Sequence, residues 1–173
     1  MSLRAQRRRR FGAAHTPLPA GWAPSQLIRA IVERALPLLP APWAAPQVRL
    51  RGWLAQLSFG EPRRHYEVWY HGRSQRLEVG LHLEADAATN QRLCAYLDGH
   101  RLPIKAALGA QAELEPWDRG WVRLYETLPA ERLDETLAER AATRLAAYVA
   151  VLQPLLDDAP PATASRTGAA RSR

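Results

Sequence analysis

Two stretches of the chain carry apolar residues at the spacing of a helix buried on one side. The first follows Pro24, where Ser25 is suited to cap the opening turn, and it closes at Pro37. The second runs from Leu133 to Leu156 and predicts a helix of roughly 25 residues, the longest element of the chain. Asp86 predicts the start of a further helix that ends at Gly109, with a kink or restart at Pro103.

Alternating apolar and polar residues predict strands between these helices. The segment 47–59 alternates, with Gly52 as a candidate bulge and Val48, Leu50 and Leu54 on one side. Two hairpins follow, formed by 65–70 with 75–84 and by 112–117 with 120–127. In the 75–84 arm the leucines and Val79 share one face, so the opposite face, with Glu78 and His82, is expected to meet water.

These elements predict one domain of the α+β class. Their order reads α-β-β-β-α-β-β-α, which indicates a mainly antiparallel sheet of about five strands with the helices on one face. We expect residues 24–158 to form this domain, with a disordered basic lead at 1–23 and a disordered basic tail at 159–173.

The positive charge belongs to the ends of the chain. The net charge is +7, yet residues 11–158 hold sixteen basic and seventeen acidic side chains, so the domain itself is nearly neutral. No apolar run reaches the roughly 20 residues of a membrane span. The single cysteine, Cys94, excludes an internal disulfide and a cysteine-ligated zinc site. We therefore expect a cytoplasmic protein that does not associate with a membrane.

The segment 77–158 resembles an uncharacterised bacterial family, catalogued as domain of unknown function 4268. The matching residues are the strand 77–81, then Asn90, Leu93, Leu97 and Ile104 of the next helix, the Leu108-Gly109 helix end, the segment 114–117, and the strand 121–125 before the final helix. Lys105 stands where the family usually has an acidic residue. The resemblance implies the same strand-helix-strand-strand-helix order and carries no catalytic residue.

Known catalytic constellations are incomplete. A restriction-type nuclease could use Glu67 and Glu78 on the two hairpin arms, but Gly80 stands at the position of the required lysine, and the only lysine is Lys105. We expect both glutamates to be solvated strand residues.

The sequence also lacks a motif for a metal site or for a catalytic nucleophile. No zinc motif is present, although His65, His82 and Glu84 could converge on one sheet face; we expect exposed histidines and no metal site. Cys94 is expected to be a half-buried thiol with no catalytic role. We therefore predict no cofactor and no catalytic residue.

Binding functions fit the composition better than catalytic functions do. The leading hypothesis is a non-catalytic accessory module that associates with nucleic acid through arginines at both ends of the chain: Arg7, Arg8, Arg9, Arg10, Arg166, Arg171 and Arg173. The alternative is a protein-interaction adaptor whose element order is similar to that of small secretion-type chaperones, and a metal-dependent nuclease is the minority hypothesis.

Tryptophans on the predicted strands offer a second candidate surface. Trp53, Trp69, Trp117 and Trp121 all fall there, and an exposed row of them could stack bases or contact a protein. The competing interpretation is that they fill the core or shield the sheet edge. Trp69, Trp121 and Arg123 are the candidate residues of such a sheet-face site.

Overall fold

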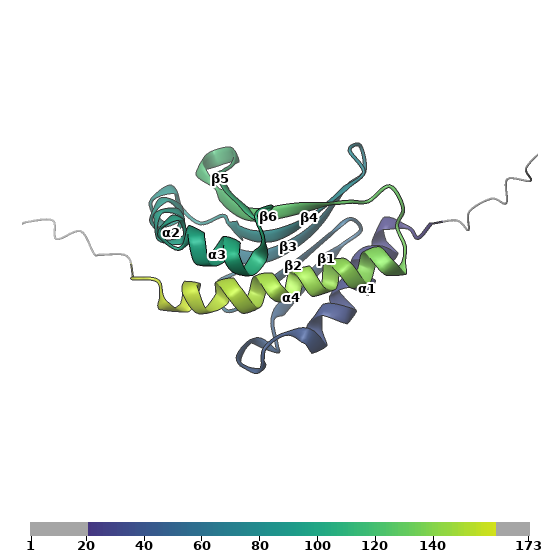
Figure 1. The fold of residues 1–173 in the computed structure, drawn as a ribbon, viewed down its shortest axis with the longest axis horizontal. Coiled ribbons are helices and arrows are strands. Elements are labelled where there is room, and N and C mark those ends of the chain that lie inside the picture. Colours follow the sequence, from purple (N-terminus) through teal and green to yellow (C-terminus); the bar gives the residue numbers. More distant parts are fainter. Residues whose placement is uncertain (1–20, 162–173) are drawn as a thin grey trace, which may run out of the picture.

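The computed structural model describes residues 21–161, which form an α+β fold built on one antiparallel sheet (Figure 1). The helices are α1 (Pro24–Ala35), α2 (Ala87–Gly99), α3 (Arg101–Leu108) and α4 (Glu135–Asp158), with short 3-10 turns η1 (Leu36–Leu38), η2 (Ala41–Trp43) and η3 (Asp118–Gly120). The strands are β1 (Gln47–Arg51), β2 (Leu54–Ser58), β3 (Arg64–His71), β4 (Arg76–Leu83), β5 (Glu113–Pro116) and β6 (Val122–Pro129). Their order in the sheet is β1-β2-β3-β4-β6-β5, so β1 and β5 are the edges.

The expected fold class is confirmed, with six strands where about five were predicted. The difference arises at Gly52 and Trp53, which form a turn between β1 and β2 instead of a bulge within one strand. The turn reverses the chain and pairs Arg51 with Leu54. Leu54 therefore lies on the polar face of the sheet, opposite to the face predicted for it, and Trp53 lies in the turn rather than on a strand.

The helix ends follow local chemistry. Pro24 takes the first helical position and Ala23 is the N-cap of α1, so Ser25 does not cap it. Asp86 and Asp134 cap α2 and α4 with side-chain hydrogen bonds to the amides of Thr89 and Leu137. The expected restart near Pro103 is found at His100, where α2 ends and α3 begins.

The hydrophobic core lies between one face of the sheet and the helices α1 and α4 (Figure 1). The alternating residues Leu77, Val79 and Leu81 of β4 are fully buried on this face. Tyr66 of β3 lies on the same face, and its hydroxyl donates a hydrogen bond to Gln153 of α4 at 3.1 Å. The side chains that alternate with these residues must point to the other face of the sheet.

Gly80 marks a close approach of β4 to β6. It pairs with Tyr125, and a Cβ added at Gly80 would lie 2.5 Å from both Leu124 O and Tyr125 Cβ. The backbone of β6 would have to move to admit a methyl group. We expect Gly80→Ala to lower the free energy of unfolding by about 1–3 kcal/mol in urea denaturation. Gly52→Ala is the matched control, because no atom of the described residues lies within 4 Å of its added Cβ. Equal stability of the two variants would contradict the close approach.

None of the helices within residues 21–161 combines the length and apolar character needed to cross a membrane.

Candidate functional site

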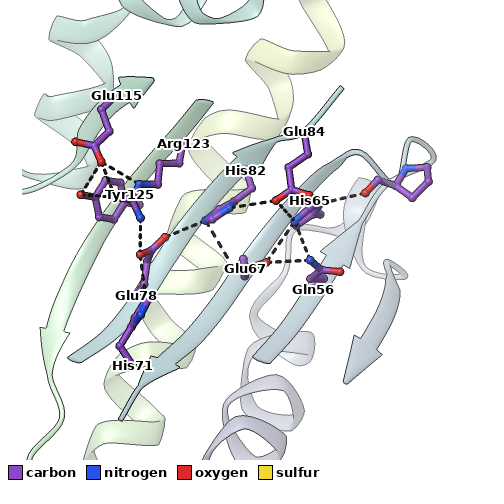
Figure 2. Close-up of polar contacts among 11 residues, drawn as sticks. Gln56, His65, Glu67, His71, Glu78, His82, Glu84, Glu115, Arg123 and Tyr125 are labelled. Atoms are coloured by element: carbon purple, nitrogen blue, oxygen red, sulfur yellow. Dashed lines mark hydrogen bonds and ion pairs between the residues drawn. The ribbon is translucent and has the colours of Figure 1, made fainter. Parts of the chain in front are cut away.

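Histidine and glutamate side chains form a buried cluster on the sheet face opposite the core (Figure 2). His65 and Glu67 come from β3, and Glu78 and His82 come from β4; their exposed fractions are 2%, 4%, 2% and 0%. The antiparallel register places His65 directly opposite His82, and the two rings stack with centroids 5.8 Å apart. The cluster is therefore assembled by strand pairing from two adjacent strands.

His65 is held in one orientation by a backbone carbonyl. Its Nδ1 lies 3.0 Å from Pro62 O and must donate a proton to it, since a carbonyl can only accept. The other ring nitrogen, Nε2, faces the side chains of Gln56 and Glu67, at 3.0 Å from Gln56 Nε2 and 3.4 Å from Glu67 Oε2. The Gln56 amide also donates to Glu67 Oε2 at 2.9 Å.

His82 lies among three carboxylates. Its Nε2 is 3.0 Å from Glu78 Oε1 and 3.9 Å from Glu67 Oε1, whereas Nδ1 is 3.8 Å from Glu84 Oε1, beyond hydrogen-bond distance. Burial alone would lower the pKa of His82, but the bond to Glu78 and the charges of Glu84 and Glu67 outweigh burial and raise its pKa from 6.5 to about 9. Nδ1 is a buried nitrogen that has no hydrogen-bond partner among residues 21–161.

Glu78 connects the cluster to a second group of polar side chains on β5 and β6. It accepts a hydrogen bond from Arg123 Nη1 at 2.9 Å, and Arg123 also binds Glu115 Oε1 at 2.6 Å. The Tyr125 hydroxyl donates to the same oxygen at 3.1 Å. Burial would raise the pKa of Glu78, but His82, Arg123 and His71 lower it below 4.5.

Aromatic rings cover the cluster at the β5–β6 end. The Trp117 ring meets His82 edge-on with centroids 5.4 Å apart, and Arg123 lies over the same ring at 5.1 Å. Trp69 and Trp121 flank Trp117 at centroid distances of 6.2 and 5.8 Å. All three tryptophans are half-buried and pack on one another, so this row shields the buried histidines. It also brings together the predicted surface residues Trp69, Trp121 and Arg123.

The structure changes the interpretation of the two nuclease candidates. Glu67 and Glu78 were expected to be solvated, and that expectation is wrong: both are buried and bound to other side chains. Lys105 lies on α3 and binds Glu113 Oε1 at 2.8 Å and the Ala110 carbonyl at 2.9 Å. Lys105, the only lysine of the sequence, thus binds these two groups and not Glu67 or Glu78.

The remaining candidate residues lie in the buried cluster, on α2 and outside the described residues. His65 and His82 are buried rather than exposed, and Glu84, half-buried, lies beside them, so the three do converge. Cys94 of α2 is half-buried, and burial raises its thiol pKa. The arginines Arg7, Arg8, Arg9, Arg10, Arg166, Arg171 and Arg173 lie outside the described residues.

The role of Gln56 and the joint burial of Glu67 and Glu78 were not predicted from the sequence. The available signal was the alternation of His65 and Glu67 on one strand with Glu78 and His82 on the next, which puts four ionisable groups on one face. No family model, no curated protein and no solved structure matches this chain. The resemblance to domain of unknown function 4268 accordingly stays a prediction.

Proposed function

We propose that this protein is a non-catalytic binding module that takes up an extended protein segment along strand β1. The observation that carries the proposal is the exposure of this edge. All five residues of β1 are exposed, and within residues 21–161 β1 pairs only with β2. An edge strand presents unpaired backbone N–H and C=O groups, to which another extended chain can add.

Apolar side chains are concentrated at the same edge. Five large apolar residues of the described chain are exposed, and three of them, Val48, Leu50 and Trp53, belong to the β1–β2 hairpin. A groove beside the edge is lined by the apolar residues Ile28 and Leu50 and by the polar residues Ser25, Arg29 and Arg51. The opposite edge, β5, is only four residues long and ends at Pro116, which has no backbone N–H to donate to an added strand.

The charge of β1 supports an acidic partner. Arg49 and Arg51 form no ion pair with any residue between 21 and 161, whereas Arg123 and Arg144 are both paired. Pairing of β1 with β1 of a second copy in the register centred on Arg49 would bring arginines face to face, which is destabilising. The fitting partner is an extended segment in which acidic residues alternate with aliphatic ones.

Charge reversal on β1 tests this proposal. We expect Arg49→Glu combined with Arg51→Glu to weaken the binding of short fluorescent peptides in which Glu alternates with Val. Two exposed ion pairs of up to about 1 kcal/mol each correspond to a loss of roughly thirtyfold in affinity. Fluorescence anisotropy measures the affinity, and amide chemical shifts report whether residues 47–53 respond.

The control is Arg101→Glu combined with Arg119→Glu, which changes the net charge equally at exposed sites away from β1. This control should bind the acidic peptides with an affinity close to that of the unmodified protein. Absence of binding to the acidic peptides, or an equal loss in both double variants, would contradict strand addition at β1.

Nucleic-acid association is a second candidate, favoured by the eight arginines in residues 1–20 and 162–173. A chain that concentrates its excess positive charge at its ends can neutralise phosphates with those ends. This candidate does not depend on β1 and has its own test in the Discussion.

A further inference from the structure

The buried cluster contains a set of metal-ligating atoms that the proposed binding function does not use. One nitrogen of His65, one nitrogen of His82 and one carboxylate oxygen of Glu67 lie within 4.8 Å of one another. All three side chains are at least nine-tenths buried. Two imidazoles and one carboxylate are ligands that zinc and related divalent metals accept in proteins.

We infer that His65, Glu67 and His82 form a binding site for a divalent transition metal ion of the zinc type. Zinc bonds of about 2.0–2.2 Å place the ligand atoms of a tetrahedral site roughly 3.3–3.6 Å apart. His65 Nε2 lies 3.4 Å from Glu67 Oε2, within this range, and His82 Nε2 lies 3.9 Å from the other oxygen, Glu67 Oε1, so each histidine lies beside one oxygen of the same carboxylate. Small side-chain rotations would bring the three ligands onto one ion.

The outer contacts of the histidines match those of metal ligands. A metal-bound histidine usually donates its second ring N–H to a carbonyl or carboxylate, which fixes the ring. His65 Nδ1 has such a partner in Pro62 O, so its Nε2 is the nitrogen available to a metal. His82 Nδ1, which has no hydrogen-bond partner in the described part of the chain, lies 3.8 Å from the carboxylate of Glu84.

The metal-free contacts are compatible with this assignment. The Gln56 amide nitrogen lies 3.0 Å from His65 Nε2 and 2.9 Å from Glu67 Oε2, so the acceptor atoms of both side chains point toward one position. A metal ion would take over these acceptors from the amide. At His82 it would replace the proton that Nε2 donates to Glu78, and that proton would be released to solvent, as happens when a metal binds a protonated ligand.

Glu84 is a further carboxylate beside the three proposed ligands. Its Oε1 is 3.9 Å from His65 Nε2, and its side chain is 23% exposed. Glu84 therefore stands between the buried ligands and solvent, where it can complete the coordination or orient a bound water. In either arrangement the protein surrounds the metal site except at Glu84, where solvent can reach it.

Titration of the full-length, chelator-treated protein with Co²⁺ tests the inference, because Co²⁺ occupies zinc sites and its visible absorption reports the ligands. We expect one Co²⁺ per chain, displaced by Zn²⁺. His65→Gln and His82→Gln should each weaken binding by more than about 100-fold, since loss of an outer contact alone costs about 10–100-fold. Glu67→Gln, which preserves the shape of the side chain, should also weaken Co²⁺ binding.

His71→Gln is the matched control. His71 lies on the same sheet face and contacts Glu78 at 3.3 Å, but it does not belong to the three-ligand set. This variant should retain the Co²⁺ spectrum and affinity of the unmodified protein. The inference is overturned if the unmodified protein shows no Co²⁺ absorption, or if the absorption survives in folded His65→Gln and Glu67→Gln proteins.

Discussion

Replacing Arg144 with methionine should lower the free energy of unfolding by about 3–5 kcal/mol, the cost of leaving a buried charge without its partner. Arg144 of α4 binds both oxygens of Glu126, at 2.6 Å through Nε and 2.7 Å through Nη2. It also donates to the carbonyl of Leu108 at the end of α3. Glu126 pairs with Val79 and so lies on the core face of the sheet, where its side chain is 1% exposed.

Urea denaturation measures this effect, and two further variants separate its causes. Arg140→Met changes an exposed arginine one turn earlier in α4 and should cost little. The double variant Glu126→Leu with Arg144→Met removes both charges and should recover most of the loss, because a buried ion pair and an apolar pair of similar size are often close in stability. A single Arg144→Met variant as stable as Arg140→Met would show that Glu126 finds water or another partner.

The sequence predicted the parts of the fold that depend on local periodicity. The final helix, expected from Leu133 to Leu156, is observed as Glu135–Asp158, because its apolar residues recur at helical spacing over its whole length. The core face of β4 was identified in the same way, from alternation of period two. Both patterns are properties of a single segment and need no information about its neighbours.

Strand register was harder to predict because it depends on turn geometry. A turn over residues 71–74 would pair Tyr70 with Gln75 and would place His65 opposite Gly80. The observed turn occupies residues 72–75, with Gln75 at a φ of 51°, and it places His65 opposite His82. A non-glycine residue at positive φ is uncommon, so the sequence pattern offered little warning of this shift. The stacked histidines follow from it.

Burial of the glutamates was mispredicted for a general reason. Ionised side chains are seldom buried unless paired, so a lone glutamate on an alternating strand is best assigned to solvent. Here the partners come from other strands: Glu78 from β4 meets Arg123 from β6, and Glu67 meets Gln56 from β2. Pairing across strands lowers the free-energy cost of burying an ionised side chain. The sequence of one strand does not show which side chain of another strand will be its partner.

Removing residues 1–20 and 162–173 together should sharply weaken any nucleic-acid binding while leaving the thermal midpoint of unfolding unchanged. The cuts keep Trp22, which packs against the core and whose amide donates to Leu133 O at 2.7 Å. They also keep Pro160, whose carbonyl accepts a hydrogen bond from Arg92. The truncation removes eight arginines and no acidic residue, so the remaining domain is nearly neutral.

The decisive measurement is duplex DNA binding by fluorescence anisotropy across a series of salt concentrations, beside calorimetric melting of the same proteins. The slope of log affinity against log salt should fall by about 0.9 for each phosphate that the protein no longer neutralises, up to about 7 if every removed arginine holds a phosphate. A full-length variant with these eight arginines changed to glutamine separates charge from length and should behave like the truncation. If the truncated protein instead binds DNA with the original salt slope, the phosphates must contact the domain itself. Arg49 and Arg51 of β1, which form no ion pair within residues 21–161, then become the first residues to replace. An earlier melting transition would show that one of the removed segments stabilises the domain.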